Sequence, residues 1–226
     1  MQVIYEDNHI IAINKEIGEI VQSENPDDQP LENKVKAYVK AKYDKKGDVF
    51  LGVVHRIDQP VSGVVIFART SKALVRLNEM FKEKTVKKIY WAVVKNKPEN
   101  DSGVLVNYIR RNQTQNKSYI ATNEKDGAKK ASLAYNLIGA SKNYFLLEIE
   151  LHTGRHHQIR AQLAYIKCPI RGDLKYGYER SNTDGGINLH ARSIGFVHPV
   201  SKQQIEIVAP LPHDNLWRMF EGVKLD

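Results

Sequence analysis

The sequence has one cysteine, no long apolar run and no arginine among its first fifty residues. Because Cys168 has no second cysteine to pair with, an internal disulfide and a cysteine-based zinc site are excluded. A membrane-spanning helix needs roughly 18 apolar residues, and no run approaches that length. The N-terminus carries Glu6 and Asp7 where a signal peptide would be basic and then apolar. We therefore expect a cytoplasmic protein that binds no membrane.

Positive charge is concentrated in the later part of the chain. The 226 residues carry a net charge of +8, and 42% hydrophobic with 27% charged residues is a balance typical of folded chains. The first fifty residues hold seven lysines and ten acidic residues, so they carry −3 and the remainder carries +11. This asymmetry indicates a polyanionic partner, most simply a nucleic acid, or a basic surface that serves only solubility.

Short apolar runs with strand character outnumber helical patterns. We expect strands at 3–5, 10–14, 50–54, 62–68, 88–94, 103–108, 131–138, 144–151, 188–197 and 204–208, and helices at 31–43, 71–81 and 154–166. The pattern predicts an α+β fold with a mixed, mainly antiparallel sheet and flanking helices and loops. We interpret residues 1–226 as one domain of two packed halves, divided in the polar segment 95–102. The polar segment 110–130 is expected to be a hairpin or loop.

A polar loop between two apolar runs contains the first candidate for chemistry, Asp58. A carboxylate that is partly removed from water and has Arg56 two residues away is suited to act as a nucleophile or base. Aspartate is also a common turn former, and Pro60 follows two residues later. On the residues alone, the turn is the favoured interpretation.

A second cluster runs from Thr153 to Arg160, where a strand leads into a helix. Thr153 is expected to cap this helix, as Ser71 is expected to cap the one at 71–81. His156 and Arg160 are four residues apart and would share a helix face, to grip an anion or simply to meet solvent. The histidines here lack the H-E-x-x-H pattern, and no G-x-G-x-x-G or G-K-[ST] segment is present. Neither a metal nor a nucleotide cofactor is predicted.

Six ordered segments together resemble the RluA-type branch of the pseudouridine synthases. They are an opening hairpin ending in NKEIG (14–18), HRID with SG (55–58 and 62–63), KIY (88–90), LHTGRHHQIR (151–160), IRGD with YG (170–173 and 176–177), and LHA with HP (189–191 and 198–199). The chain departs from the family pattern at Glu16, Ile57 and Val61, where proline, leucine and threonine are usual. Segments in this order and at these spacings are far more specific than any one of them, so the resemblance changes the interpretation of Asp58 from turn residue to nucleophile.

The resemblance implies that the N1–C1′ bond of a uridine in RNA is cut, the base turned, and the base rejoined through C5. This is an isomerisation, so no cofactor and no metal are expected. Asp58 is implied as the nucleophile on C1′ or C6, and Arg160 as the arginine that holds it ionised. Tyr90 is implied to pack against the base and is a candidate to remove the C5 proton.

The resemblance also implies RNA contacts for His55, Arg56, Arg155 and Leu189. Arg56 would enter the gap left by the extracted base, and Leu189 would line the base pocket. Arg110 and Arg111, in the basic segment 110–130, are candidate RNA-binding residues on charge alone. We expect a monomer without an N-terminal accessory domain that acts on a stem-loop of transfer RNA, ribosomal RNA or both.

Three other functions are weaker interpretations of the same residues. A glycosidase-like enzyme would need a second acidic group near Asp58, where the sequence has His55 and Arg56. A non-catalytic RNA-binding protein explains the basic charge but gives no reason for Asp58. A phosphate-processing metalloenzyme fails on the spacing of its histidines.

Overall fold

The computed structural model describes residues 1–223 and divides into two compact units. Unit 1 comprises Met1–Val86 and Ala191–Pro210, and unit 2 comprises Lys87–His190 and the residues from Leu211 onward. The first boundary between the units lies between Val86 and Lys87, whereas the sequence predicts a division in segment 95–102. That segment connects two adjacent strands inside unit 2. Its proline and polar residues suit a tight connection as well as a linker.

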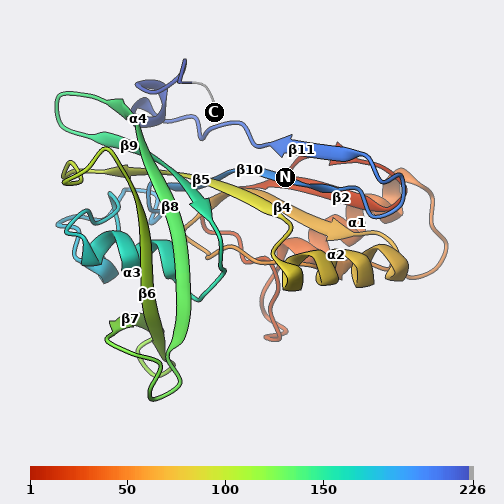
Figure 1. The fold of residues 1–226 in the computed structure, drawn as a ribbon. Coiled ribbons are helices and arrows are strands. Elements are labelled where there is room, and N and C mark those ends of the chain that lie inside the picture. Colours follow the sequence, from red (N-terminus) through yellow and green to blue (C-terminus); the bar gives the residue numbers. More distant parts are fainter. Residues whose placement is uncertain (224–226) are drawn as a thin grey trace. The chain divides into compact units, whose positions relative to one another are not determined.

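Unit 1 is built on a sheet in the order β1-β2-β4-β10, with β3 beside β4 and β11 beside β10 (Figure 1). Its elements are β1 (Gln2–Glu6), β2 (Ile10–Lys15), α1 (Leu31–Lys42), β3 (Gly52–Val53), β4 (Ser62–Ala68), α2 (Ser71–Glu83), β10 (Leu189–Val197, in this unit from Ala191) and β11 (Gln204–Val208). Every residue of β4 is buried, and α1 buries Leu31, Val35 and Val39. The core of unit 1 thus forms around its central strands.

Two expectations for unit 1 are corrected. The strand expected at 50–54 is reduced to Gly52–Val53, and Phe50 is 47% exposed. β3 pairs with the end of β4, where Gly52 lies opposite Ala68, so Phe50 falls beyond β4, and past Val53 the same edge of β4 is taken by β10. The N-cap of α2 is Thr70, not Ser71, since the Thr70 side chain accepts a hydrogen bond from the backbone N–H of Ala73 at 3.2 Å.

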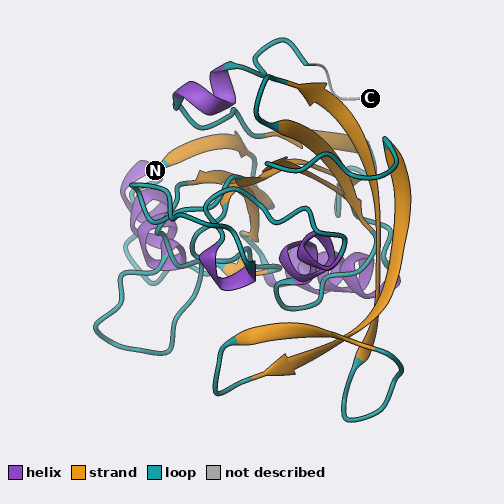
Figure 2. Ribbon diagram, turned by 90° about the vertical axis from the view of Figure 1, so that its left-hand side faces the viewer, coloured by secondary structure: helices purple, strands orange, loops and turns teal. Residues whose placement is uncertain are grey.

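Unit 2 is an antiparallel sheet in the order β5-β9-β8-β6-β7 (Figures 1 and 2). Its elements are β5 (Lys87–Val94), β6 (Ser102–Asn112), β7 (Lys117–Ala121), β8 (Lys129–Ala140), β9 (Phe145–Leu151), α3 (Gln158–Tyr165), the 3-10 turn η1 (Leu174–Tyr176) and α4 (Asn215–Arg218). Segment 110–130 is thus a hairpin, because β6 continues into it and pairs with β7. The expected α+β class with a mainly antiparallel sheet is confirmed.

Different elements pack on the two faces of the unit 2 sheet. Trp91 lies on one face, where it packs in a core with Trp217 and Phe220 and donates a 3.1 Å hydrogen bond from Nε1 to Glu148 Oε2. The other face is covered by α3, whose Gln162 amide donates to Asn107 Oδ1 at 2.8 Å. Strand register places Tyr90 on the same face as Asn107. The helix therefore lies over the tyrosine side of the sheet.

Candidate functional site

The Asp58 loop joins β3 to β4 in unit 1. The side chain of Asp58 is half-buried, and its backbone carbonyl accepts a hydrogen bond from Val61 at 3.0 Å, so the residue does form a turn. Arg56 is exposed. His55 Nε2 accepts a hydrogen bond from the backbone N–H of Ile66 at 3.1 Å. The His55 ring stacks on the ring of Phe81, with the ring centroids 5.1 Å apart. The loop is therefore anchored at its start to both β4 and α2.

Lys15 is the residue of this region to which the sequence interpretation gave no role. It ends β2 with 1% exposure, and its Nζ donates to the carbonyls of Glu16 (2.9 Å), Glu19 (2.8 Å) and Gln59 (3.2 Å). These bonds tie the Asp58 loop to the loop after β2. Burial lowers the pKa of Lys15 to about 8, while the negative charges of Glu19 and Asp58 act in the opposite direction. The sequence signal that could have revealed this role is a lysine at the end of an apolar strand.

Replacing Lys15 by methionine is expected to change how the free energy of unfolding depends on pH, because Lys15 is buried. The pKa of Lys15 is 10.5 in the unfolded chain and about 8 in the folded protein, so folding is penalised below pH 8 and the penalty fades toward pH 10.5. Between about pH 8 and pH 10.5, the unfolding free energy of the wild type should rise by up to about 3 kcal/mol relative to that of Lys15→Met. Denaturant unfolding at several pH values measures the difference.

Lys34→Met is the matched control, because this exposed α1 lysine pairs with Glu19 at 2.7 Å. The difference in unfolding free energy between Lys34→Met and the wild type should not change with pH. A flat difference for Lys15→Met as well would contradict the burial argument.

In unit 2, Arg160 and Asp173 form a buried, two-bonded ion pair. Arg160 Nε lies 2.7 Å from Asp173 Oδ2, and a terminal nitrogen lies 2.9 Å from Oδ1. The two residues are 5% and 1% exposed. The guanidinium also lies over the ring of Tyr176 at 5.0 Å. Asp173 therefore fixes the plane of Arg160, a role that sequence reasoning missed although Asp173 lies in the recognised IRGD segment.

The start of α3 differs from the sequence interpretation. The helix begins at Gln158, and its N-cap is His157 in a left-handed conformation (φ 52°), so His156 precedes the helix and does not share a helix face with Arg160. Thr153 is not the cap either. Its Oγ1 accepts the Ser132 N–H at 2.9 Å, which binds the segment to β8. The helical spacing in the sequence predicted too early a start for α3, because the chain turns sharply before the helix begins.

Replacing Asp173 by asparagine should destabilise the protein by about 3 kcal/mol, because the buried Arg160 loses the charge of the carboxylate that accepts two of its hydrogen bonds. Asp126→Asn is the control: Asp126 is exposed and lies 3.8 Å from Arg110, so its loss should change stability by less than about 0.5 kcal/mol. Thermal unfolding of both variants gives the comparison. Equal, small effects would show that the buried pair carries little stability.

The predicted site residues fall into both units. Unit 1 contains His55, Arg56 and Asp58, and unit 2 contains Tyr90, Arg110, Arg111, Arg155, Arg160 and Leu189. Within unit 2, Tyr90 lies on the sheet face that α3 covers, the helix that carries Arg160. Arg155 Nε donates to the Lys130 carbonyl at 3.0 Å. Leu189 is buried at the start of β10.

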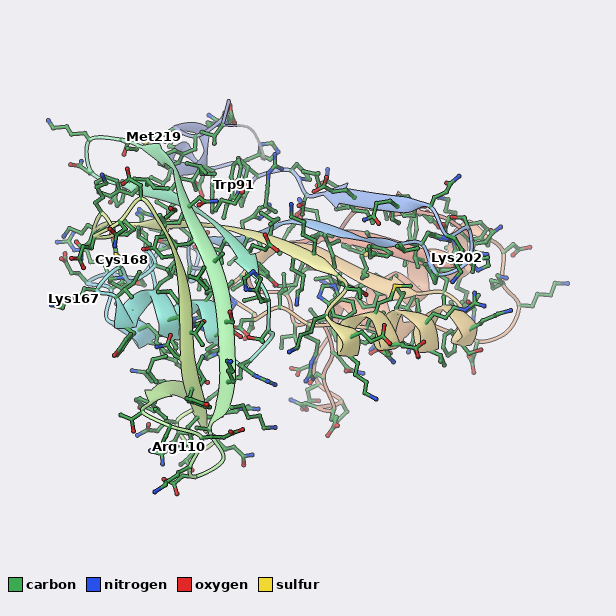
Figure 3. The ribbon with its side chains drawn as sticks, in the orientation of Figure 1. Trp91, Arg110, Lys167, Cys168, Lys202 and Met219 are labelled. Carbon is green, nitrogen blue, oxygen red and sulfur yellow. The ribbon has the colours of Figure 1, made fainter. Side chains whose placement is uncertain are left out.

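Figure 3 shows Arg110 toward the end of the hairpin that β6 and β7 form. Its side chain is exposed. Arg110 thus lies away from Trp91, which is buried in the core on the sheet face opposite α3. Arg110 is therefore an exposed basic residue on a defined hairpin.

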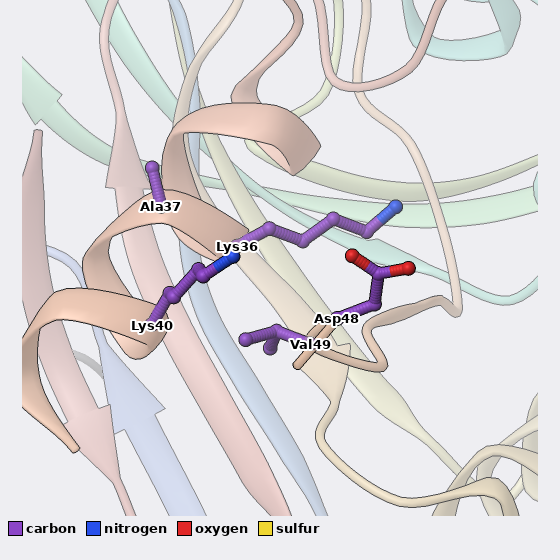
Figure 4. Close-up of a pocket in the computed structure, with 5 residues that line it drawn as sticks. All are labelled: Lys36, Ala37, Lys40, Asp48 and Val49. Atoms are coloured by element: carbon purple, nitrogen blue, oxygen red, sulfur yellow. The ribbon is translucent and has the colours of Figure 1, made fainter. Parts of the chain in front are cut away.

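Other features of the described residues add no chemistry to these motifs. Among residues 1–223, no three histidine, cysteine or acidic side chains gather as a metal would require. None of the helices in this range has the length and apolar character to cross a membrane. A pocket of about 350 Å³ in unit 1 is lined by Lys36, Ala37, Lys40, Asp48 and Val49 (Figure 4). None of the recognised motifs contributes to it.

Comparison with known proteins identifies the family. Residues 9–165 match the RNA pseudouridylate synthase family. The chain is 33% identical over 215 residues to YlyB of Bacillus subtilis, described as an uncharacterised RNA pseudouridine synthase, covering 95% of this chain and 70% of that one. It is 30% identical over 224 residues to ribosomal large subunit pseudouridine synthase D of Zymomonas mobilis, with the same coverage.

Solved structures agree on the fold. Human RNA pseudouridylate synthase domain containing 4 superposes with a TM-score of 0.77 at 23% identity, over 93% of this chain and 88% of the human one. Human RNA pseudouridylate synthase domain containing 1 gives a TM-score of 0.70 at 20% identity, over 93% of this chain and 83% of the human one. With the six motif segments found in order, the chain belongs to the RluA-type RNA pseudouridine synthases, isomerases that convert uridine in RNA to pseudouridine.

Proposed function

We propose that this enzyme modifies uridine in large-subunit ribosomal RNA and that Asp58 is its nucleophile. The substrate proposal is supported by relatives named as ribosomal large subunit synthases, D of Zymomonas mobilis and C of Rickettsia bellii, at 30% and 33% identity. The nucleophile proposal rests on one observation above all. The HRID segment forms a loop with a half-buried Asp58, and the backbone of the next residue is pinned by the buried ammonium of Lys15.

The proposed reaction conserves all atoms of the nucleoside. Asp58 attacks C1′ or C6 and forms a covalent bond, the N1–C1′ bond breaks, the turned base forms a C5–C1′ bond, and the bond to Asp58 breaks again to free the carboxylate. The C5 proton must then leave, and Tyr90 is the group proposed to take it. N1 ends with a proton in place of its glycosidic bond, so oxidation state is unchanged. Arg160, oriented by Asp173, is proposed to keep Asp58 ionised.

RNA recognition is proposed to combine base extraction with phosphate contacts. A uridine stacked in a stem must flip out before a half-buried carboxylate can reach it. Arg56 is exposed on the Asp58 loop and would fill the vacated position. Arg110, Arg111 and Arg155 lie on or next to the β6–β7–β8 hairpins and would contact the backbone.

Transcribed, unmodified RNA tests the substrate and the reaction together. The protein would be incubated with large-subunit ribosomal RNA, small-subunit ribosomal RNA and a transfer RNA pool, and the nucleosides would then be separated. We expect pseudouridine in the large-subunit RNA. Pseudouridine found only in transfer RNA or in the small-subunit RNA would overturn the substrate, and none in any RNA would overturn the function.

A further inference from the structure

One face of β6 is open to solvent along most of the strand. Asn107 faces α3, whereas Val104 and Val106 point to the opposite face and are 63% and 53% exposed. Strand register places this opposite face on the side of Trp91, which is buried in the core at β5. The sheet face opposite α3 is therefore covered at β5 and open at β6.

Two tyrosines of unit 2 lie on this open face. Tyr108 follows Val106 by two residues and so points the same way, and its side chain is half-buried. Tyr119, in β7, is 39% exposed and pairs directly with Arg110 of β6, which places both side chains on this face. Since Tyr108 pairs with the residue two positions after Tyr119, the two tyrosines are diagonal neighbours, a spacing that aromatic side chains can bridge.

A cation accompanies each of the two rings. Arg110 lies beside Tyr119 on the neighbouring strand, and the exposed Lys130 of β8 pairs directly with Tyr108. The ammonium of Lys117 lies 5.4 Å from the centre of the Tyr119 ring, close enough for a cation–π contact. We call the part of the open face formed by Val106, Tyr108, Arg110, Tyr119 and Lys130 the tyrosine face.

Acidic neighbours leave the tyrosine face positive. Asp126 lies 3.8 Å from Arg110, but the two side chains are 78% and 55% exposed, so water and salt weaken this pair. Glu150, in β9, pairs with Ala134, which pairs with Val104. It therefore lies near the other end of β6, away from the tyrosines.

Aromatic rings with cations beside them suit unpaired nucleotides. Bases stack on exposed aromatic rings while the cations meet the phosphates between them. In a duplex the bases stack on one another, so an aromatic side chain on a sheet can reach only bases that are splayed out. A protein partner is less suited to this surface, because the centre of a protein interface is depleted of charged residues, lysine in particular.

We propose that the tyrosine face binds a single-stranded segment of RNA by stacking nucleobases on Tyr108 and Tyr119. Arg110 and Lys130 would contact the adjoining phosphates, and Val106 would extend the apolar floor. The inference rests on the proposed function, since the substrate supplies the RNA. It adds a preference for unpaired nucleotides to the phosphate contact already proposed for Arg110.

Binding of two matched oligonucleotides tests this proposal. The first is a short oligocytidylate, which has no uridine to enter the active site, and the second has the same backbone without its bases. Tyr108→Ala and Tyr119→Ala should each weaken binding of the oligocytidylate at least about fivefold and leave binding of the abasic strand unchanged. Arg110→Ala should instead weaken binding of both strands.

The salt dependence separates stacking from phosphate contacts. Stacking releases no counterions, so the two tyrosine variants should keep the wild-type slope of log affinity against log salt. Arg110→Ala should lower that slope by about 0.7, the value for one phosphate of a single strand. Tyr119→Phe removes the 2.5 Å hydrogen bond from the hydroxyl to Gln115 but keeps the ring, so its affinity should stay at the wild-type level.

Tyr165→Ala is the matched control, because Tyr165 ends α3 in the same unit and is 63% exposed. It should leave both affinities unchanged, and thermal unfolding checks that every variant is folded. Equal binding of the two oligonucleotides by the wild type would overturn the proposal, as would tyrosine variants that bind the oligocytidylate normally. A wild-type dimer that becomes monomeric in Tyr119→Ala would assign the tyrosine face to a second copy of the chain and also overturn it.

Failure of this inference can be told apart from failure of the proposed function. If the tyrosine variants lose affinity as expected but the wild type makes no pseudouridine in any RNA, the proposed function fails and the stacking surface stands. If the wild type makes pseudouridine while the tyrosine variants bind normally, only the stacking surface fails.

Discussion

Replacing Asp58 by asparagine is expected to abolish pseudouridine formation while leaving the fold and RNA binding intact. The amide keeps the shape of the side chain, and the backbone bond from Val61 to the Asp58 carbonyl is untouched. What disappears is the negative charge that nucleophilic attack requires. We expect at least a thousandfold loss of turnover, equivalent to about 4 kcal/mol or more in the barrier. Nucleoside analysis after single-turnover incubation measures it.

The turn interpretation of Asp58 predicts the opposite result. Asparagine is a good turn former, so activity would survive if the residue only shaped the loop. The structure shows that Asp58 does make a turn with Val61, so only the activity of the variant separates the two roles. An Asp58→Asn protein that retains about a tenth of wild-type turnover would refute the nucleophile assignment.

Replacing Gly63 by alanine is expected to cost more than about 4 kcal/mol of stability, at the upper end of single substitutions. Gly63 lies in β4 with φ +115°, a conformation that L residues rarely adopt. A Cβ there would approach three backbone atoms of Ala191, in β10, more closely than the 3.0 Å that real Cβ atoms respect. Because the obstacle is backbone, no side chain can move aside, and the two strands must separate. Denaturant unfolding should show the loss.

Gly47→Ala in the same unit is the control for this substitution. Nothing lies within 4 Å of a Cβ built at Gly47, and its φ is not in the left-handed region. Its stability should stay within about 0.5 kcal/mol of the wild type. If Gly63→Ala behaved in the same way, the close approach of β4 and β10 would not be a real constraint.

Local patterns predicted most of the elements that position the site. The apolar runs at 10–14 and 62–68 are β2 and β4, and the spacing of Leu31, Val35 and Val39 is α1. The run at 50–54 failed at both ends, because β10 takes the edge of β4 past Val53, and Phe50 lies beyond Ala68, where β4 ends. Such competition between distant strands leaves no trace in the local sequence.

The partners of site residues were much harder to predict than the residues themselves. Arg160 and Asp173 were both visible in motifs, yet their pairing depends on how the chain returns after α3. Lys15 reaches Gln59 across 44 positions, and His156 reaches Asn116 across 40. The sequence therefore indicates which groups carry chemistry, while the folded chain determines which carbonyl, carboxylate or ring each one meets.

The order in which the chain visits its two units has a consequence for synthesis on the ribosome. Unit 1 is interrupted after Val86 and receives its last strands, β10 and β11, only after about 100 residues of unit 2 have been made. The entropic cost of closing so long a loop is only slightly larger than that of closing a shorter one. Until then the edge of β4 that β10 will occupy is unpaired, and an open edge attracts other chains. A nascent chain stalled between residues 86 and 190 would therefore be the form most prone to aggregate and most dependent on a chaperone.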